Sequence, residues 1–306
     1  MAAENETVST DFFLVGFSDV PRLQGLLFGS FVSIYLMIIT GNLMIMTVVY
    51  SDLRLHTPMY FFLTQLSFVD IGCTSVIFPK MLAGFFLQHI RIAFKACILQ
   101  LYFFILFVAL EIVLLSIMAY DRYIAICNPL HYATIINKEA CLKFATGAWI
   151  VGFLEPIVPS ILISNFSFCQ THKINHFFCD LTAMMKLSCT STRNVEIINF
   201  TLGVLLPISS VILVTTSYMK IISAIIKIKT TAGRKKAFST CASHLTVVAL
   251  YYGSLMFVYL RPASSYSVGQ SKVISVLYLA LSPMCNPIVY TLKNQEFKNA
   301  LKRRKK

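Results

Sequence analysis

The segment SIMAYDRYIAICNPLHY, residues Ser116–Tyr132, interrupts a long apolar run with the charged pair Asp121–Arg122 and then becomes apolar again. The run before the pair, Cys97–Tyr120, is long enough for a membrane-spanning helix, which needs roughly 20 predominantly apolar residues. A charge pair beside such a run is costly unless it lies at a boundary or acts as a switch. The segment therefore predicts a helix that crosses a membrane and carries a functional charge at one end.

The rest of the chain repeats this apolar pattern. Of its 306 residues, 57% are hydrophobic and 13% are charged, about half the charged share of soluble domains. Met1–Gln24 lacks the early apolar core of a cleavable signal peptide. The predicted fold class is an all-α membrane protein, a bundle of seven transmembrane helices. The seven apolar windows lie at about Gln24–Tyr50, Pro58–Ala83, Cys97–Tyr120, Ala140–Leu162, Glu196–Ile226, Phe238–Leu260 and Ser271–Leu292.

The distribution of Lys and Arg predicts the orientation of this bundle. Cationic residues favour the cytoplasmic side, and most of the 26 basic residues lie there if the amino terminus is extracellular and the carboxyl terminus cytoplasmic. The net charge of +13 then reflects membrane topology, and a nucleic-acid partner is not expected. The domains are an extracellular amino terminus (1–23), a seven-helix domain (24–292) with a second extracellular loop at about 163–195, and a cytoplasmic amphipathic helix with a basic tail (293–306).

Two features of the polar segments agree with that orientation. Asn5 opens the glycosylation sequon NET in the amino-terminal segment, where luminal enzymes could reach it. Four cysteines lie on the oxidising side, an even number that suits two disulfides: Cys97, Cys169, Cys179 and Cys189. Their spacing leaves the pairing open.

One face of the third predicted helix carries a series of distinctive residues. An α-helix turns about 100° per residue, so separations of 7, 7 and 11 keep Cys97, Phe104, Glu111 and Arg122 on nearly one face. Glu111 lies at a depth of roughly 17 Å from the cytoplasmic side, as does Asp70 of the second helix. This face must contact protein, because lipid does not tolerate a carboxylate near the bilayer centre.

Two acids and two amides thus lie at similar depth: Asp70, Glu111, Asn42 and Asn286. Carboxylate and amide oxygens favour a hard cation, and neighbouring acids favour a shared proton. No cofactor is expected apart from a sodium ion, which Asp70 and Glu111 could hold together with Asn286. A structural hydrogen-bond network without an ion is the alternative.

The sequence resembles one family over nearly its whole length. MAYDRYIAICNPLHY, from Met118 to Tyr132, is similar to the signature of olfactory receptors, a branch of the rhodopsin-like G-protein-coupled receptors. Its short third extracellular loop, around 261–271, resembles the tetrapod-type (class II) branch. Further matching motifs are GN at 41–42, PMYFFLTQLSFVD at 58–70, PKML at 79–82, HFFCD at 176–180, SY at 217–218, KAFSTCASHL at 236–245 and PMCNPIVY at 283–290.

The resemblance implies roles for several of these residues. Arg122 would be the microswitch that engages the G protein, with Tyr218 and Tyr290 rearranging beside it. Disulfides would join Cys97 to Cys179 and Cys169 to Cys189. Asp70 and Glu111 would form a sodium-type site. The full predicted switch is Asp121, Arg122, Tyr123, Tyr218, His244 and Tyr290.

The outer half of the bundle is where we expect the ligand, since sites in bundles form between helices. The family places its odorant contacts on the outer faces of these helices, and the residues of this sequence at those faces carry no charge. The expected ligand is therefore small, neutral and mostly apolar, with one hydrogen bond from Tyr252 or Tyr259. Burial of such a molecule gives micromolar affinity or weaker. Ordinary packing is the alternative for any single residue. The predicted contacts are Leu101, Phe104, Ile105, Val108, Ala109, Leu202, Gly203, Leu206, Tyr252, Leu255, Met256, Tyr259, Val276 and Leu279.

The predicted protein is therefore an odorant receptor and not an enzyme. We expect a multi-pass protein of the plasma membrane, and the resemblance implies the cilia of olfactory neurons. The expected partners are an odorant, membrane lipid and a stimulatory, olfactory-type G protein that raises cyclic AMP. An ion channel or transporter using the midplane acids should show internal repeats or paired broken helices, and neither is visible. A non-olfactory rhodopsin-like receptor is disfavoured by KAFSTCASHL and by the three-cysteine loop.

Overall fold

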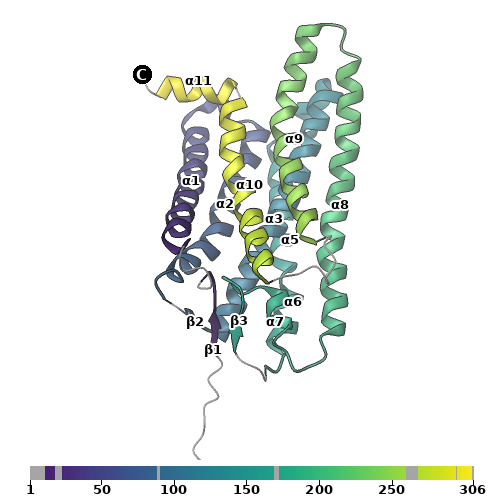
Figure 1. Cartoon of the computed structure of the whole chain (residues 1–306). Helices are drawn as coiled ribbons and strands as arrows, with labels where there is room; N and C mark the ends of the chain where they lie inside the picture. The colour runs from purple at the N-terminus through teal and green to yellow at the C-terminus, as the bar shows by residue number, and fades with distance from the viewer. Residues whose placement is uncertain are drawn as a thin grey trace, which may run out of the picture.

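The computed structural model describes residues 11–17, 23–87, 90–168, 172–259, 268–293 and 295–304. Long helices that lie side by side dominate this part of the chain (Figure 1). They are α1 (Gln24–Ser51), α2 (Pro58–Ala83), α3 (Phe94–Cys127), α5 (Lys138–Leu154), α6 (Ile157–Ser164), α8 (Arg193–Ile226), α9 (Thr231–Tyr259) and α10 (Val268–Lys293). Shorter helices are η2 (Leu53–Leu55), η3 (Pro129–His131), α4 (Tyr132–Ile135), α7 (Leu181–Met185) and α11 (Gln295–Arg304).

Within the described residues, five helical segments are long and apolar enough to cross a membrane: α1, α2, α3, α5 together with α6, and α8. With α9 and α10, the long segments in this part of the chain number seven. The fourth is interrupted between Leu154 and Ile157, where Pro156 removes a backbone donor. The predicted window Ala140–Leu162 is therefore two helices that follow one another.

Local sequence explains where several helices begin. Pro58 occupies the first turn of α2, where its missing N–H costs nothing, and Thr57 before it is extended. Asn137 caps α5, with its side-chain oxygen accepting from the Ala140 N–H at 2.8 Å. A side chain at Gly152 would meet Leu110, because a Cβ built there lies 2.7 Å from the Leu110 Cγ. Glycine thus lets α5 pack closely on α3.

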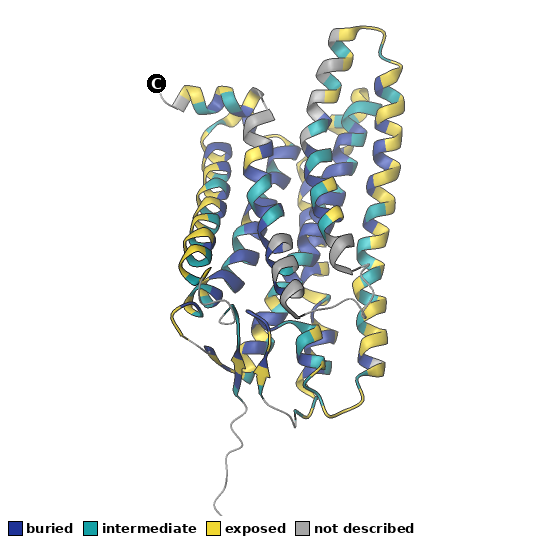
Figure 2. Ribbon diagram, viewed as in Figure 1, coloured by how far each residue is buried: buried dark blue, intermediate teal, exposed yellow. Residues whose placement is uncertain are grey.

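α3 lies at the centre of the bundle and packs against α2, α5 and α8, whereas α10 packs against α9 and α1. Figure 2 shows buried residues on the inward faces and exposed ones along the outer sides of α1 and α8. The outer sides are apolar: Leu26, Phe200 and Leu205 are each about 70% exposed, at 69%, 72% and 69%. Such faces suit a lipid environment.

The two ends of the bundle differ. One end, the α11 end, carries α11 (Figure 1). The α11 helix is held to the corner between α1 and η2, where the Arg303 Nε donates to Asp52 Oδ2 at 3.1 Å. The other end, the sheet end, carries a three-stranded sheet of order β2-β1-β3.

The sheet is built from β1 (Asp11–Leu14), β2 (Ile90–Ala93) and β3 (Lys173–Ile174). β1 is the middle strand, antiparallel to β2 and parallel to β3. Its side chains alternate: Phe12 and Leu14 are buried, and Phe13 is 37% exposed. The sequence predicts only an extracellular amino terminus over 1–23, so β1 is an element that the sequence did not reveal.

Candidate functional site

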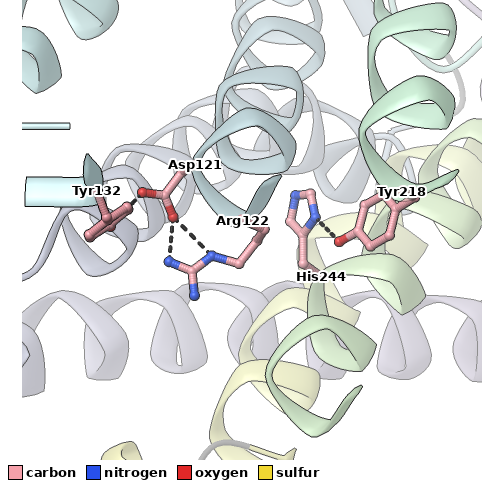
Figure 3. Close-up of polar contacts among 5 residues, drawn as sticks. All are labelled: Asp121, Arg122, Tyr132, Tyr218 and His244. Carbon is pink, nitrogen blue, oxygen red and sulfur yellow. Dashed lines mark hydrogen bonds and ion pairs between the residues drawn. The ribbon is translucent and has the colours of Figure 1, made fainter. Parts of the chain in front are cut away.

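The charged pair of α3 lies inside the helix at the α11 end, not beyond its last turn. The Arg122 Nε donates to Asp121 Oδ2 at 2.9 Å, and the guanidinium Nη2 contacts the same oxygen. The other carboxylate oxygen accepts from the Tyr132 hydroxyl at 2.7 Å (Figure 3). Burial, together with the Asp121 charge, raises the pKa of Tyr132, which therefore remains a neutral donor. Asp121 is thus held by one cation and one phenol.

A second contact joins α8 to α9 on the other side of Arg122. The Tyr218 hydroxyl lies 2.6 Å from His244 Nδ1, and the two rings stack with centroids 5.8 Å apart (Figure 3). Both side chains are buried. Lys220 lies 5.2 Å from the centroid of the Tyr123 ring, a cation–π contact between α8 and α3. The predicted switch residues on α3, α8 and α9 are thus neighbours, and the Tyr290 side chain lies outside the described residues.

The two acids near the bilayer centre, Asp70 and Glu111, accept separate hydrogen bonds within one buried cluster. The Asn286 amide donates to Asp70 Oδ2 at 2.8 Å, and the Ser282 hydroxyl donates to Glu111 Oε1 at 2.5 Å. Asp70 and Glu111 are close enough to interact electrostatically. α10 therefore supplies a polar partner to each acid.

Several oxygens of this cluster have no hydrogen-bond partner among the described residues. They are Asp70 Oδ1, Asn286 Oδ1 and, on α1, Asn42 Oδ1. Buried acceptors of this kind are costly unless a proton, a cation or water satisfies them. Oxygen ligands with a carboxylate charge are also what a hard cation prefers. The donor set therefore fits the sodium-type site that the sequence predicts.

A chain of hydroxyl groups crosses the bundle. The sequence did not predict it. The Ser116, Ser210 and Tyr252 hydroxyls form successive contacts from α3 through α8 to α9. All three residues are buried. Serine is common in membrane helices, so only its position on the inward face, beside a predicted contact residue, could have drawn attention to it. The Tyr252 hydroxyl thus already has a partner within the bundle.

At the sheet end, the predicted Cys97–Cys179 disulfide is present and joins α3 to the loop before α7. Gln100 supports this loop, because its side-chain oxygen accepts from the Cys179 N–H at 3.0 Å. Cys189 is also disulfide-bonded. Its predicted partner Cys169 lies outside the described residues, as does the Asn5 sequon.

The HFFCD motif packs its first residues into the bundle. His176, Phe177 and Phe178 are buried, and the Phe178 ring meets Phe104 of α3 with centroids 5.2 Å apart. Burial lowers the pKa of His176, so the imidazole is neutral. This part of the predicted second extracellular loop thus packs against Phe104 of α3.

The predicted odorant contacts divide into two groups. Phe104, Val108, Val276 and Leu279 belong to one apolar cluster between α2, α3 and α10, which also includes Phe178. Leu101 and Ile105 belong to a different cluster beside the disulfide, and Ala109 is buried. On α8, Leu202 and Leu206 are half-buried and Gly203 is exposed. The side chains of Leu255, Met256 and Tyr259 lie outside the described residues.

Two cavities in the described part of the molecule can be compared with the predicted contacts. One, of about 290 Å³, lies between α3, α5 and α8, and Leu206 is the one predicted contact that lines it. The other, of about 870 Å³, lies at the α11 end between α1, α2, α4 and α5. The odorant contacts therefore stay a prediction.

Comparison with known proteins identifies the fold. The structure is similar to the crystal structure of squid rhodopsin, with a TM-score of 0.75 and 17% sequence identity, over 94% of this chain and 80% of that chain. The chain thus has the fold of this seven-helix protein, so the prediction of a seven-helix membrane bundle is confirmed.

The sequence comparisons identify the family. The family model described as olfactory receptor matches residues 31–305. The chain is 45% identical to Olfactory receptor 1G1 of Gorilla gorilla gorilla, over 99% of this chain and 97% of that protein. It is 44% identical to Olfactory receptor 8H3 of Homo sapiens, over 98% of this chain and 96% of that protein. The chain belongs to the olfactory receptor family and is a multi-pass membrane receptor, not an enzyme.

Proposed function

We propose that this receptor binds a small, neutral, mostly apolar volatile molecule in the sheet half of the bundle and activates a stimulatory G protein at the α11 end, which raises cyclic AMP. The observation that carries the ligand class is the cluster around Phe104, whose members are aromatic and aliphatic. The buried amine at the sheet end, Lys272, already donates to the Gly16 carbonyl. A charged ligand would lose its hydration among these apolar side chains.

The amino terminus is extracellular in this proposal. Two features support it: the disulfide at the sheet end requires an oxidising compartment, and α11 at the opposite end is rich in cations. The plasma membrane, and the cilia of olfactory neurons, are the proposed location. Glycosylation of Asn5 and contact of α11 with inner-leaflet lipid are parts of the same proposal.

In the proposed mechanism, a movement of Tyr252 on α9 changes the contacts of Arg122. Ligand packing in the sheet half shifts α9, which breaks the contacts of Tyr252 with Ser210 and of His244 with Tyr218. The α11 end of α9 then moves outward and frees Arg122 for the G protein. The ligand needs only to favour one of two existing states by a few kcal/mol.

Sodium is the proposed cofactor of the resting state. Asp70, Glu111 and Asn286 would hold it, supported by the unpartnered buried oxygens of Asp70 and Asn286. Bound sodium would supply a positive charge that compensates the charge of the acids. The chain's own contribution is to orient these acids, through Asn286 on one and Ser282 on the other.

The decisive experiment measures cyclic AMP in cells that express the full chain, with a panel of neutral volatiles. Arg122→Ala is compared with Arg193→Ala, which removes an exposed arginine at the start of α8. We expect a response in the parent and in Arg193→Ala, and no response in Arg122→Ala at equal surface expression. Ion flux without cyclic AMP would contradict the receptor proposal, and responses confined to charged ligands would contradict the ligand class.

A further inference from the structure

The larger cavity has the size and lining of a ligand site. Its volume of about 870 Å³ falls within the range of about 300–1,000 Å³ that is usual for small-molecule sites. The cavity is open to the surroundings of the bundle, because its lining residues Tyr50 and Leu142 are 85% and 64% exposed. Its walls are mainly apolar and include Val49, Leu55, Phe61, Ile136 and Leu142.

Polar groups divide between the two ends of this cavity. Gln65, on the inner wall, already accepts from the Trp149 Nε1 at 3.1 Å, and Thr64 donates to the Tyr60 carbonyl at 2.9 Å. The mouth lies at the first residues of α2 and α5, where His56, Thr57, Asn137 and Lys138 are exposed. The interior therefore suits hydrocarbon and the mouth suits a polar headgroup.

The charge at the mouth is positive. Lys138 has no acidic partner among the described residues. The acids nearby in sequence are engaged elsewhere, since Asp52 pairs with Arg303 and Glu139 pairs with Lys143 at 2.7 Å. No acidic residue lines the cavity in the described part of the chain. The mouth is thus complementary to an anion.

We propose that this cavity binds one anionic phospholipid of the inner leaflet, with an acyl chain in the apolar interior and its phosphate on Lys138 and His56. The leaflet assignment rests on the proposed function, in which the α11 end is cytoplasmic. Anionic lipids are concentrated in that leaflet and attract basic residues near the surface.

The bound lipid would also act on the switch. Tyr132 lines the cavity and donates its hydroxyl to Asp121, the partner of Arg122. A chain packed in the cavity holds Tyr132 where it makes this bond. Occupancy therefore favours the resting pairing of Asp121 with Arg122.

The test uses the full chain in phosphatidylcholine nanodiscs with increasing fractions of phosphatidylserine. Tm is measured for the parent, for Lys138→Gln and for Ala133→Phe, which puts a larger side chain into the cavity wall. Lys143→Gln is the matched control, because it removes an exposed lysine of the same helix that does not line the cavity. Basal nucleotide exchange on an added stimulatory G protein is measured in the same discs.

Phosphatidylserine should raise the Tm of the parent and of Lys143→Gln by about 3 °C. Lys138→Gln should need about fivefold more of the lipid for the same effect, the loss expected for one basic residue near the surface. Ala133→Phe should lose the effect, and phosphatidylserine should slow basal exchange only where it raises Tm.

Three outcomes would overturn the proposal. Equal stabilisation of all four proteins would show a general surface-charge effect. The absence of any stabilisation would show that the lipid does not bind. Stabilisation by a sterol in phosphatidylcholine, abolished in Ala133→Phe and unchanged in Lys138→Gln, would replace the phospholipid with a neutral occupant. The Tm measurement needs no odorant, so it stands apart from a failure of the odorant response.

Discussion

Removing the Tyr132 hydroxyl tests whether the α11-end contacts hold the receptor at rest. A hydrogen bond to a charged acceptor contributes about 1.5–3 kcal/mol, and because Tyr132 is only half-buried we use the lower value. Each 1.4 kcal/mol corresponds to about a tenfold change in an equilibrium. Tyr132→Phe keeps the ring and leaves the ion pair of Asp121 with Arg122 in place. We expect cyclic AMP without ligand to rise by up to about tenfold.

Tyr102→Phe is the matched control for this measurement. The Tyr102 hydroxyl donates to the Phe153 carbonyl at 2.9 Å, nearer the sheet end of α3 and away from the switch. Both variants and the parent are compared at equal surface expression. Basal cyclic AMP that is unchanged in Tyr132→Phe, or raised equally in Tyr102→Phe, would refute the reasoning.

Serine at Cys97 or Cys179 removes a cross-link between residues 82 apart, worth about 4 kcal/mol in the loop-entropy account, and both single variants and the double variant should lower Tm equally. Asp70→Asn should abolish the rise in Tm that sodium chloride, compared with choline chloride, gives the ligand-free receptor. Asp52→Asn should speed hydrogen–deuterium exchange in α11, because the carboxylate that accepts from Arg303 is lost. This hydrogen bond lowers the pKa of Asp52 below its ordinary value of 3.8. The contact with Arg303 is therefore complete above pH 3.8 and is lost as the pH falls through the lowered pKa.

The long helices could be predicted because hydrophobicity reports which residues lipid can accept. The window Pro58–Ala83 coincides with α2, where Pro58 marks the start. α3 shows the limit of this approach: its window ends at Tyr120, whereas the helix continues to Cys127. A helix does not end where the hydrocarbon ends, so Asp121 and Arg122 extend it into the polar region.

The polar contacts could be predicted only where residue type was unusual for its surroundings. Asp70 and Glu111 were visible as acids in apolar windows, but Ser282, which donates to Glu111, was not. Tyr132 is the last residue of the signature segment, but its bond to Asp121 depends on how α4 folds back. Such partners follow from tertiary structure, which residue spacing does not contain.

The sheet has a consequence for how the receptor is made. β1 is synthesised first, yet it is the middle strand, and its partners at Arg91 and Lys173 emerge much later. In the proposed orientation this end lies in the lumen, so Phe12 and Leu14 are covered only after the second extracellular loop has been translocated. Until then their side chains are exposed apolar surface of the kind that makes an incomplete chain prone to aggregation. Completion of the sheet is therefore a late step in the folding of this receptor, although its middle strand is made first.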